Sequence, residues 1–151
     1  MNKKPINEME LSFPSCSSNE AFARAAVASF AAQLDPTLEE ICDLKTAVSE
    51  AVTNCIIHGY KDTIGMVYIV VKLFENREIL VKIRDKGCGI EDVQKAMEPL
   101  FTTGGEERAG LGFAVMQSFT DKLTVTSKMG KGTTVTMRKY FSRRLTVNEQ
   151  G

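Results

Sequence analysis

The stretch that decides the fold covers residues 79–90 and reads Ile79-Leu80-Val81-Lys82-Ile83-Arg84-Asp85-Lys86-Gly87-Cys88-Gly89-Ile90. Side chains alternate between the two faces of a β-strand. Apolar residues occupy one face of this stretch, and Asp85 falls in phase with them. A carboxylate that points toward a core is costly unless hydrogen-bond donors surround it. The stretch therefore predicts a strand over residues 79–85 that ends in a carboxylate and then enters a glycine-rich turn.

Two interpretations of Asp85 are compatible with this local pattern. The carboxylate can cap the turn that follows it, which is a common role for Asp before Gly, and the pattern alone favours this interpretation. The carboxylate can also accept a hydrogen bond from an exocyclic amine such as adenine N6. Gly87 and Gly89 allow a tight turn and a close approach by a flat ligand.

A helix is predicted upstream of this strand, from Thr37 to residue 58. Thr37 and Glu40 stand at capping-box spacing directly after a proline. Gly59 is placed to end the helix as its C′ residue. The expected core seam recurs at helical spacing and consists of Ile41, Leu44, Val48, Val52 and Cys55.

A second line of residues on this helix is polar. Glu50, Asn54 and His58 follow one another at i+4 spacing, so they share one face. Their neighbours are small or apolar, whereas an ordinary solvated face carries Lys and Glu. This line is a candidate functional surface. For His58, a hydrogen bond near the helix end and a nucleotide contact are both open.

The helix before it, after residue 18, is predicted to bury Phe22, Ala26, Phe30 and Leu34. Ser17 and Glu20 offer a capping box at its start. A smooth second stripe consists of Ala21, Ala25, Ala28 and Ala32, and Arg24 lies on the far side from Phe22. This alanine face with one arginine is either simply solvent-facing or a surface for another helix or a partner protein.

The remaining elements complete an α+β order. Strands are expected over residues 9–13, 67–74, 123–127 and 133–139, and helices over residues 91–97 and 110–119. Hairpin-length connections join two strand pairs, which predicts a two-layer sandwich with a mixed, mostly antiparallel sheet and helices on one face. Residues 1–141 are expected to form a single domain, and residues 142–151 a polar tail.

Glycines also stand where the helix over residues 110–119 is expected to begin. Backbone N–H groups at a helix N-terminus favour phosphate, so Gly110 and Gly112 are candidate phosphate contacts, or merely a hinge and a cap. Thr133 lies in phase with Val135 and Met137 on the core side of the last strand. Its hydroxyl is either a second polar contact beside Asp85 or part of an ordinary β-forming residue.

Composition excludes several classes of protein. The 151 residues carry 19 basic and 19 acidic side chains, so no basic excess supports direct nucleic-acid binding. No apolar leader or membrane-length segment is visible, and we expect a cytoplasmic protein without a membrane partner. The four cysteines lack CxxC spacing and are expected to be free thiols. No P-loop and no complete dinucleotide fingerprint is present.

The order of these motifs resembles the Bergerat-type ATP-binding fold that gyrase B, the Hsp90 chaperone, histidine kinases and MutL share. The resemblance implies bound ATP or ADP with Mg²⁺. It implies that Asn54 is the Mg²⁺ ligand and that Asp85 reads adenine, with Thr133 in support. The other nucleotide contacts that it implies are Gly87, Gly89, Thr102, Thr103, Gly110, Leu111 and Gly112, and residues 99–109 correspond to a lid over ATP.

Four segments extend the resemblance to the sporulation anti-sigma-F factors. They are residues 19–24, Ser49-Glu50-Ala51-Val52-Thr53-Asn54 together with residues 57–60, residues 99–103 and residues 107–110. Members of this family are serine protein kinases that sequester a sigma factor and phosphorylate an anti-anti-sigma protein, and they form homodimers. The lid differs from the family pattern, because Gly104-Gly105 stands where a charged residue and proline are expected.

This resemblance implies roles for three further side chains. Glu50 would be the base that accepts the proton of a serine hydroxyl, because it lies one helical turn before Asn54. Arg108 in the lid would stabilise the γ-phosphate, and Arg24 would anchor the partner proteins. The alternatives are an ATP-gated binding module of the stress-response type without efficient phosphotransfer, and an ATP hydrolase.

Overall fold

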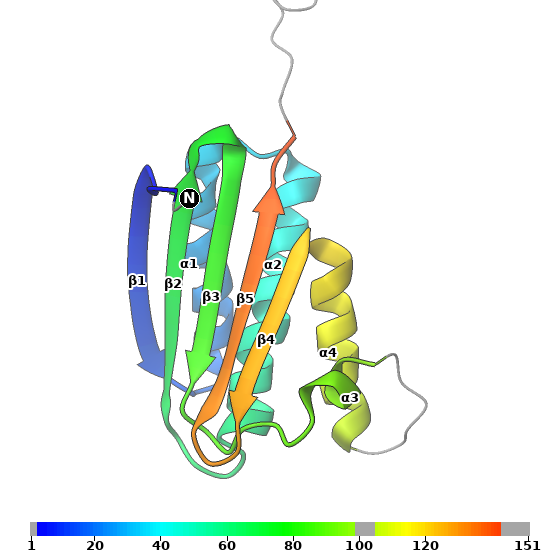
Figure 1. Cartoon of the computed structure of the whole chain (residues 1–151). Helices are drawn as coiled ribbons and strands as arrows, with labels where there is room; N and C mark the ends of the chain where they lie inside the picture. Colours follow the sequence, from blue (N-terminus) through cyan, green and yellow to red (C-terminus); the bar gives the residue numbers. More distant parts are fainter. Residues whose placement is uncertain (1–2, 99–104, 143–151) are drawn as a thin grey trace, which may run out of the picture.

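The computed structural model describes residues 3–98 and 105–142, and for residues 105–110 its description is limited to the backbone. The strands are β1 (Asn7–Pro14), β2 (Met66–Phe74), β3 (Glu78–Asp85), β4 (Lys122–Lys128) and β5 (Gly132–Tyr140). The helices are α1 (Ser18–Ala31), α2 (Leu38–Asn54), α3 (Val93–Met97) and α4 (Gly105–Phe119). The helices lie on one side of the sheet (Figure 1), which confirms the predicted two-layer α+β sandwich.

The sheet has the strand order β1-β2-β3-β5-β4. Every adjacent pair is antiparallel, so the expected antiparallel character is confirmed, but the parallel neighbours implied by a mixed sheet are not formed. The chain leaves β3 through α3 and α4 and returns at the sheet edge as β4. The hairpin then inserts β5 between β3 and β4, which point the same way without pairing (Figure 1).

The two long N-terminal helices start differently. Thr37 forms the predicted capping box, because its hydroxyl accepts from the Glu40 N–H at 3.1 Å while Glu40 accepts from the Thr37 N–H at 2.9 Å. The capping box predicted at Ser17 is wrong, since that residue is helical and its side chain caps nothing. The Glu20 carboxylate instead turns toward α2. In the described part of the chain, no helix is both long and apolar enough to cross a membrane.

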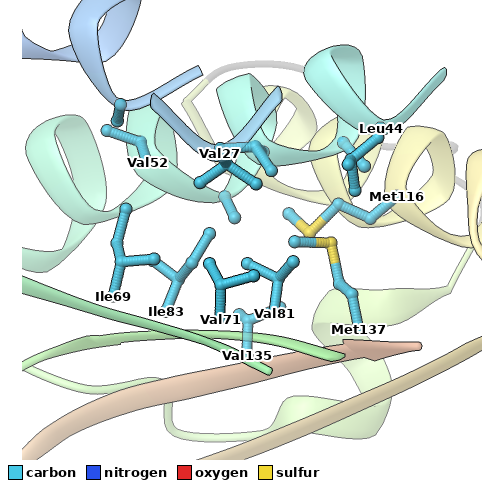
Figure 2. Close-up of a cluster of buried hydrophobic side chains, with 14 of the residues drawn as sticks. Val27, Leu44, Val52, Ile69, Val71, Val81, Ile83, Met116, Val135 and Met137 are labelled. Carbon is cyan, nitrogen blue, oxygen red and sulfur yellow. The ribbon is translucent and has the colours of Figure 1, made fainter. Parts of the chain in front are cut away.

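The core lies between the sheet and the helices. Figure 2 shows the side chains of Val27, Leu44 and Val52 facing those of Val71 and Val81 from the strands. The seam predicted for α2 is largely confirmed, because Leu44, Val48, Val52 and Cys55 are buried and Ile41 is half-buried. Each Å² of apolar surface that is removed from water stabilises the fold by roughly 25 cal/mol. This layer is therefore the main source of the free energy of unfolding.

The face that α1 buries differs from the prediction. Ala23, Val27 and Ala31 are fully buried, whereas Phe22 is 51% exposed. Small side chains let α1 approach its neighbours closely, so the narrow residues face inward and the large ring stays at the flank. The buried stripe is therefore shifted by one residue from the expected one. Of the four stripe residues predicted for the core, only Leu34 is buried, while Ala26 and Phe30 are half-buried.

Candidate functional site

A groove runs over the middle of the helical layer. Side chains from α2 form its floor, α1 supplies Glu20 and Arg24 on one side, and α4 supplies Leu111 and Val115 on the other. Figure 1 shows α2 between α1 and α4. The groove encloses about 640 Å³, and its lining from α2 and the turn after it is mostly polar: Cys42, Lys45, Thr46, Ser49, Glu50, Thr53, Asn54 and His58. The polar line predicted for this helix thus lines a cavity of ligand size.

Glu50 and Asn54 lie side by side against the backbone of α4. A Cβ atom on Gly112 would lie 3.2 Å from both amide atoms of Asn54 and from Glu50 Oε2. Glu50 is half-buried and forms no hydrogen bond or ion pair with any described residue. Asn54 Nδ2 is buried and likewise finds no partner among the described side chains and backbone groups. A carboxylate and a buried amide without partners are available to an incoming ligand.

Asp85 lies on the core face at the end of β3, as predicted, and is only 4% exposed. Its Oδ1 accepts from the Gly87 N–H at 2.9 Å and from the Thr133 N–H at 3.3 Å. The first bond is the turn cap that the local pattern favoured, and it uses one oxygen. Asp85 therefore makes the capping contact through Oδ1, while its Oδ2 faces Gly59 and its carboxylate also accepts a hydrogen bond from the Cys55 thiol.

The end of α2 is packed directly on this carboxylate. The helix continues as a single π-helical turn, Cys55–Gly59, and π-turns of this kind are frequent at functional sites. Burial raises the pKa of the Cys55 thiol well above its ordinary range, and the nearby Asp85 carboxylate raises it further. Cys55 follows Asn54 directly in the chain. The Asn54 amide in the groove and the buried Asp85 carboxylate therefore lie on either side of the same helical turn.

Backbone contacts fix the glycine-rich turn to this helix end. A Cβ atom on Gly87 would lie 2.1 Å from the Gly59 carbonyl oxygen, so only glycine fits there. The Cys88 N–H donates to the same oxygen at 2.9 Å, and the Cys88 thiol donates to the His58 oxygen at 3.2 Å. Gly89 has φ +80° and passes close to the β4–β5 turn at Lys128.

Thr133 is half-buried beside Asp85. Its backbone N–H contacts the carboxylate, whereas its hydroxyl pairs with the Ser127 hydroxyl at 2.8 Å. The Ser127 hydroxyl in turn accepts from the Ile90 N–H at 2.7 Å. Thr133 thus lies beside Asp85 but contacts it through the backbone, and not through the hydroxyl considered as a second polar contact. Through Ser127 the hydroxyl also links β5 to the segment after Gly89.

The predicted position of Gly110 and Gly112 at a helix N-terminus is wrong. The helix α4 begins at Gly105, so both glycines lie within it. The segment Glu106-Glu107-Arg108-Ala109 consists of good helix formers, which extends the helix over residues that were expected to form a loop. Gly112 therefore matters as a close-packing position against Glu50 and Asn54.

The remaining predicted residues are placed as follows. Leu111 is 56% exposed and lines the groove. Asp85 and Thr133 are not part of the groove lining. Asp85 instead contacts Gly59, at the end of the π-helical turn that follows α2. Thr102 and Thr103, the lid segment 99–104 and the side chain of Arg108 lie outside what the structure describes.

Sequence reasoning missed a polar bridge between α1 and α2. The Ser49 hydroxyl donates a short hydrogen bond to Glu20 Oε1, and Glu20 Oε2 lies 3.8 Å from an Arg24 guanidinium nitrogen. Arg24 is 40% exposed and lines the groove. The i,i+4 spacing of Glu20 and Arg24 signals their pairing, but nothing local signals the partner on α2.

Replacing Gly112 with alanine tests its contact with the polar pair. We expect the free energy of unfolding to stay the same or rise by about 1 kcal/mol, because alanine is the better helix former. The new methyl group must displace Asn54 or Glu50 by a few tenths of an ångström, so the rate of the phosphoryl transfer that the resemblance implies should fall about tenfold, because small misplacements are expensive in catalysis. Gln117→Ala on the exposed side of α4 is the control. Unchanged turnover in Gly112→Ala would show that the contact is not functional.

Comparison with known proteins agrees with this geometry. Residues 13–139 match the family model of the histidine kinase-like ATPase domain. The crystal structure of the RsbU and RsbW domains of Rv1364c from Mycobacterium tuberculosis superimposes with a TM-score of 0.67 at 19% identity, covering 93% of this chain and 34% of that one. That likeness shows the fold alone. The matched family model and the fold thus define a histidine kinase-like ATPase domain.

Relatives of higher identity narrow the class. The anti-sigma F factor of Caldanaerobacter subterraneus subsp. tengcongensis is 62% identical over 138 residues, which cover 91% of this chain and 96% of that protein. The anti-sigma F factor of Clostridium acetobutylicum is 56% identical over 137 residues, which cover 90% and 95%. The chain belongs to the anti-sigma F factor family. The resemblance noted in the sequence is confirmed.

Proposed function

We propose that this chain is an ATP-dependent protein serine kinase of the cytoplasm that binds and inhibits sigma F and phosphorylates an anti-anti-sigma protein. The observation that carries the proposal is the Glu50 carboxylate beside the Asn54 amide, both without a partner among the described residues, in a groove of about 640 Å³. A proton acceptor and a polar ligand one helical turn apart suit phosphoryl transfer, which depends on positioning and charge neutralisation. The proposed assembly is a homodimer.

The residues present fit a nucleotide with Mg²⁺. The buried Asn54 amide has no partner among the described residues, and rotation of the amide by 180° presents its oxygen, which is the kind of ligand that Mg²⁺ takes. When bound, Mg²⁺ supplies positive charge next to the phosphates. Asp85 Oδ2, which accepts neither of the two backbone hydrogen bonds, is assigned to the exocyclic amine of adenine, and the Gly87 and Thr133 N–H groups hold the carboxylate in place. Gly89 is assigned to the turn beside the base.

The chemistry of the transfer step is assigned to Glu50. A serine hydroxyl that enters the groove would give its proton to a Glu50 carboxylate oxygen while its Oγ forms a bond to the γ-phosphorus of ATP. The bond between the γ-phosphorus and the oxygen that bridges it to the β-phosphorus breaks, and ADP leaves. Gly112 keeps room for this approach because it has no side chain. Thr102, Thr103, Arg108, Gly110 and Leu111 are proposed to enclose the phosphates, with Arg108 stabilising the γ-phosphate.

Incubation with γ-labelled ATP and a candidate anti-anti-sigma protein tests the proposal. Label on the anti-anti-sigma protein is the expected result. Stable nucleotide binding without transferred label would instead indicate an ATP-gated binding module, and release of free phosphate without labelled protein would indicate a hydrolase.

Arg24→Glu tests where the partner proteins bind. The guanidinium fork of arginine suits bidentate binding of a carboxylate, so its reversal should weaken binding of sigma F and of the anti-anti-sigma protein at least about tenfold. Nucleotide affinity should stay within about twofold, and calorimetry measures both. Lys82→Glu on the exposed face of β3 is the matched charge reversal. An equal fall in nucleotide affinity would assign Arg24 a structural role.

A further inference from the structure

The groove contains a cation that the proposed mechanism does not use. Lys45 lies on α2, is half-buried and lines the groove. No described residue forms an ion pair or hydrogen bond with its ammonium group. The neighbouring carboxylate of Glu20 is already engaged by Ser49 and Arg24. A partly desolvated ammonium without a counter-charge favours the binding of an anion.

The position of Lys45 along α2 indicates whether the anion belongs to the nucleotide or to the substrate protein. The helix rises about 1.5 Å per residue, so Lys45 lies about 7.5 Å before Glu50 along the axis, and Asn54 lies about 6 Å after it. Asn54 and the turn that meets Asp85 are both at the C-terminal end of α2. A nucleotide bound there occupies the side of Glu50 that is opposite to Lys45. On the proposed function, the side of the groove that Lys45 and Arg24 line is then left for the acceptor serine.

We propose that Lys45 is a specificity-determining residue, and that it binds a carboxylate side chain of the substrate protein about two residues from the serine that is phosphorylated. The spacing follows from the length of an extended chain, which advances about 3.3 Å per residue and so covers about 7 Å in two residues. This inference rests on the proposed function. It adds a requirement on the substrate that the catalytic pair does not impose, because Glu50 and Asn54 contact only the reacting groups.

The test is charge reversal at Lys45, measured on two ligands. In Lys45→Glu the KM for the anti-anti-sigma protein should rise at least about tenfold, which corresponds to about 1.4 kcal/mol. The kcat at saturation and the affinity for ADP should each stay within about twofold. Lys82→Glu is the matched control and should change none of these values. Lys45→Gln removes the charge and leaves a slightly shorter polar side chain, and it should show a smaller rise of the same kind.

Reversal on the substrate completes the experiment. Each Asp or Glu within three residues of the labelled serine is changed to Lys in turn, and one of these changes should restore the KM of Lys45→Glu while weakening the wild-type kinase. A fall in ADP affinity equal to the change in KM would show that Lys45 binds nucleotide phosphate, and an unchanged KM would show that it binds nothing; either result overturns the inference.

Binding separates this inference from the proposed function. Calorimetry of the anti-anti-sigma protein with the ADP-bound chain reports the Lys45 contact without any transfer. If the wild type binds the protein but transfers no label, the proposed function fails while weaker binding by Lys45→Glu still supports the contact. Wild-type binding that Lys45→Glu leaves unchanged contradicts the contact, and absence of binding contradicts both.

Discussion

Glu50→Gln should transfer phosphate to the anti-anti-sigma protein about 100- to 10,000-fold more slowly than the wild type, which is the range that general-base catalysis contributes. The amide has the shape of the carboxylate but does not accept the serine proton. Glu50 forms no hydrogen bond or ion pair with any described residue, so the change breaks none, and the amide keeps the packing against Gly112. The nucleotide should therefore bind with an affinity within about twofold of the wild type.

Single-turnover transfer of label and fluorescence titration with ADP measure the two quantities separately. Glu39→Gln is the control, because Glu39 is exposed on the first turn of the same helix. Wild-type transfer by Glu50→Gln would remove this residue from the role of base. Parallel losses of transfer and of nucleotide affinity would instead make it a ligand for the nucleotide.

Asp85→Asn should lower the affinity for ATP about 100-fold. The oxygen of the new amide can keep the bonds from the Gly87 and Thr133 N–H groups, so its NH₂ group takes the place of Oδ2. A donor then faces the exocyclic amine of adenine, and an unsatisfied buried pair of this kind costs roughly 1–3 kcal/mol. The affinity for ITP, whose base presents an oxygen at that position, should fall far less.

Equilibrium binding of ATP and ITP to both proteins checks this preference. Asp121→Asn is the control, because Asp121 accepts a hydrogen bond from the Tyr140 N–H at 2.7 Å, away from the groove. Thermal unfolding without nucleotide reports any change in stability caused by the altered contacts. Equal losses of ATP and ITP affinity would mean that Asp85 supports the turn and does not read the base.

The parts of the structure that the sequence predicted well depend on local rules. The capping box at Thr37 and Glu40 needs only two residues at fixed spacing, and both of its hydrogen bonds are present. The alternation that placed Asp85 on the core side of β3 is a property of the strand itself. The polar line through Glu50 and Asn54 was visible for the same reason, because helical spacing alone aligns these two side chains.

The errors arose where tertiary packing decides. Phe22 is the larger apolar residue, but close approach of α1 to its neighbours favours Ala23 and Val27 in the core, and composition does not reveal that distance. Glu20 was expected to cap its own helix, whereas its carboxylate accepts a hydrogen bond from the Ser49 hydroxyl on α2. The family pattern predicted a loop up to residue 109, whereas helix propensity favours a helix there. The structure follows the propensity, since α4 starts at Gly105.

The contact between Gly87 and the Gly59 carbonyl leaves no side chain between the glycine-rich turn and the helix end. No side chain lies between the turn and the helix end whose exchange could change the distance between them. With adenine read by Asp85, as proposed, variants with a different base preference would have to arise through the side chains around Asp85. Cys55, whose buried thiol adjoins that carboxylate, is where such retuning would begin.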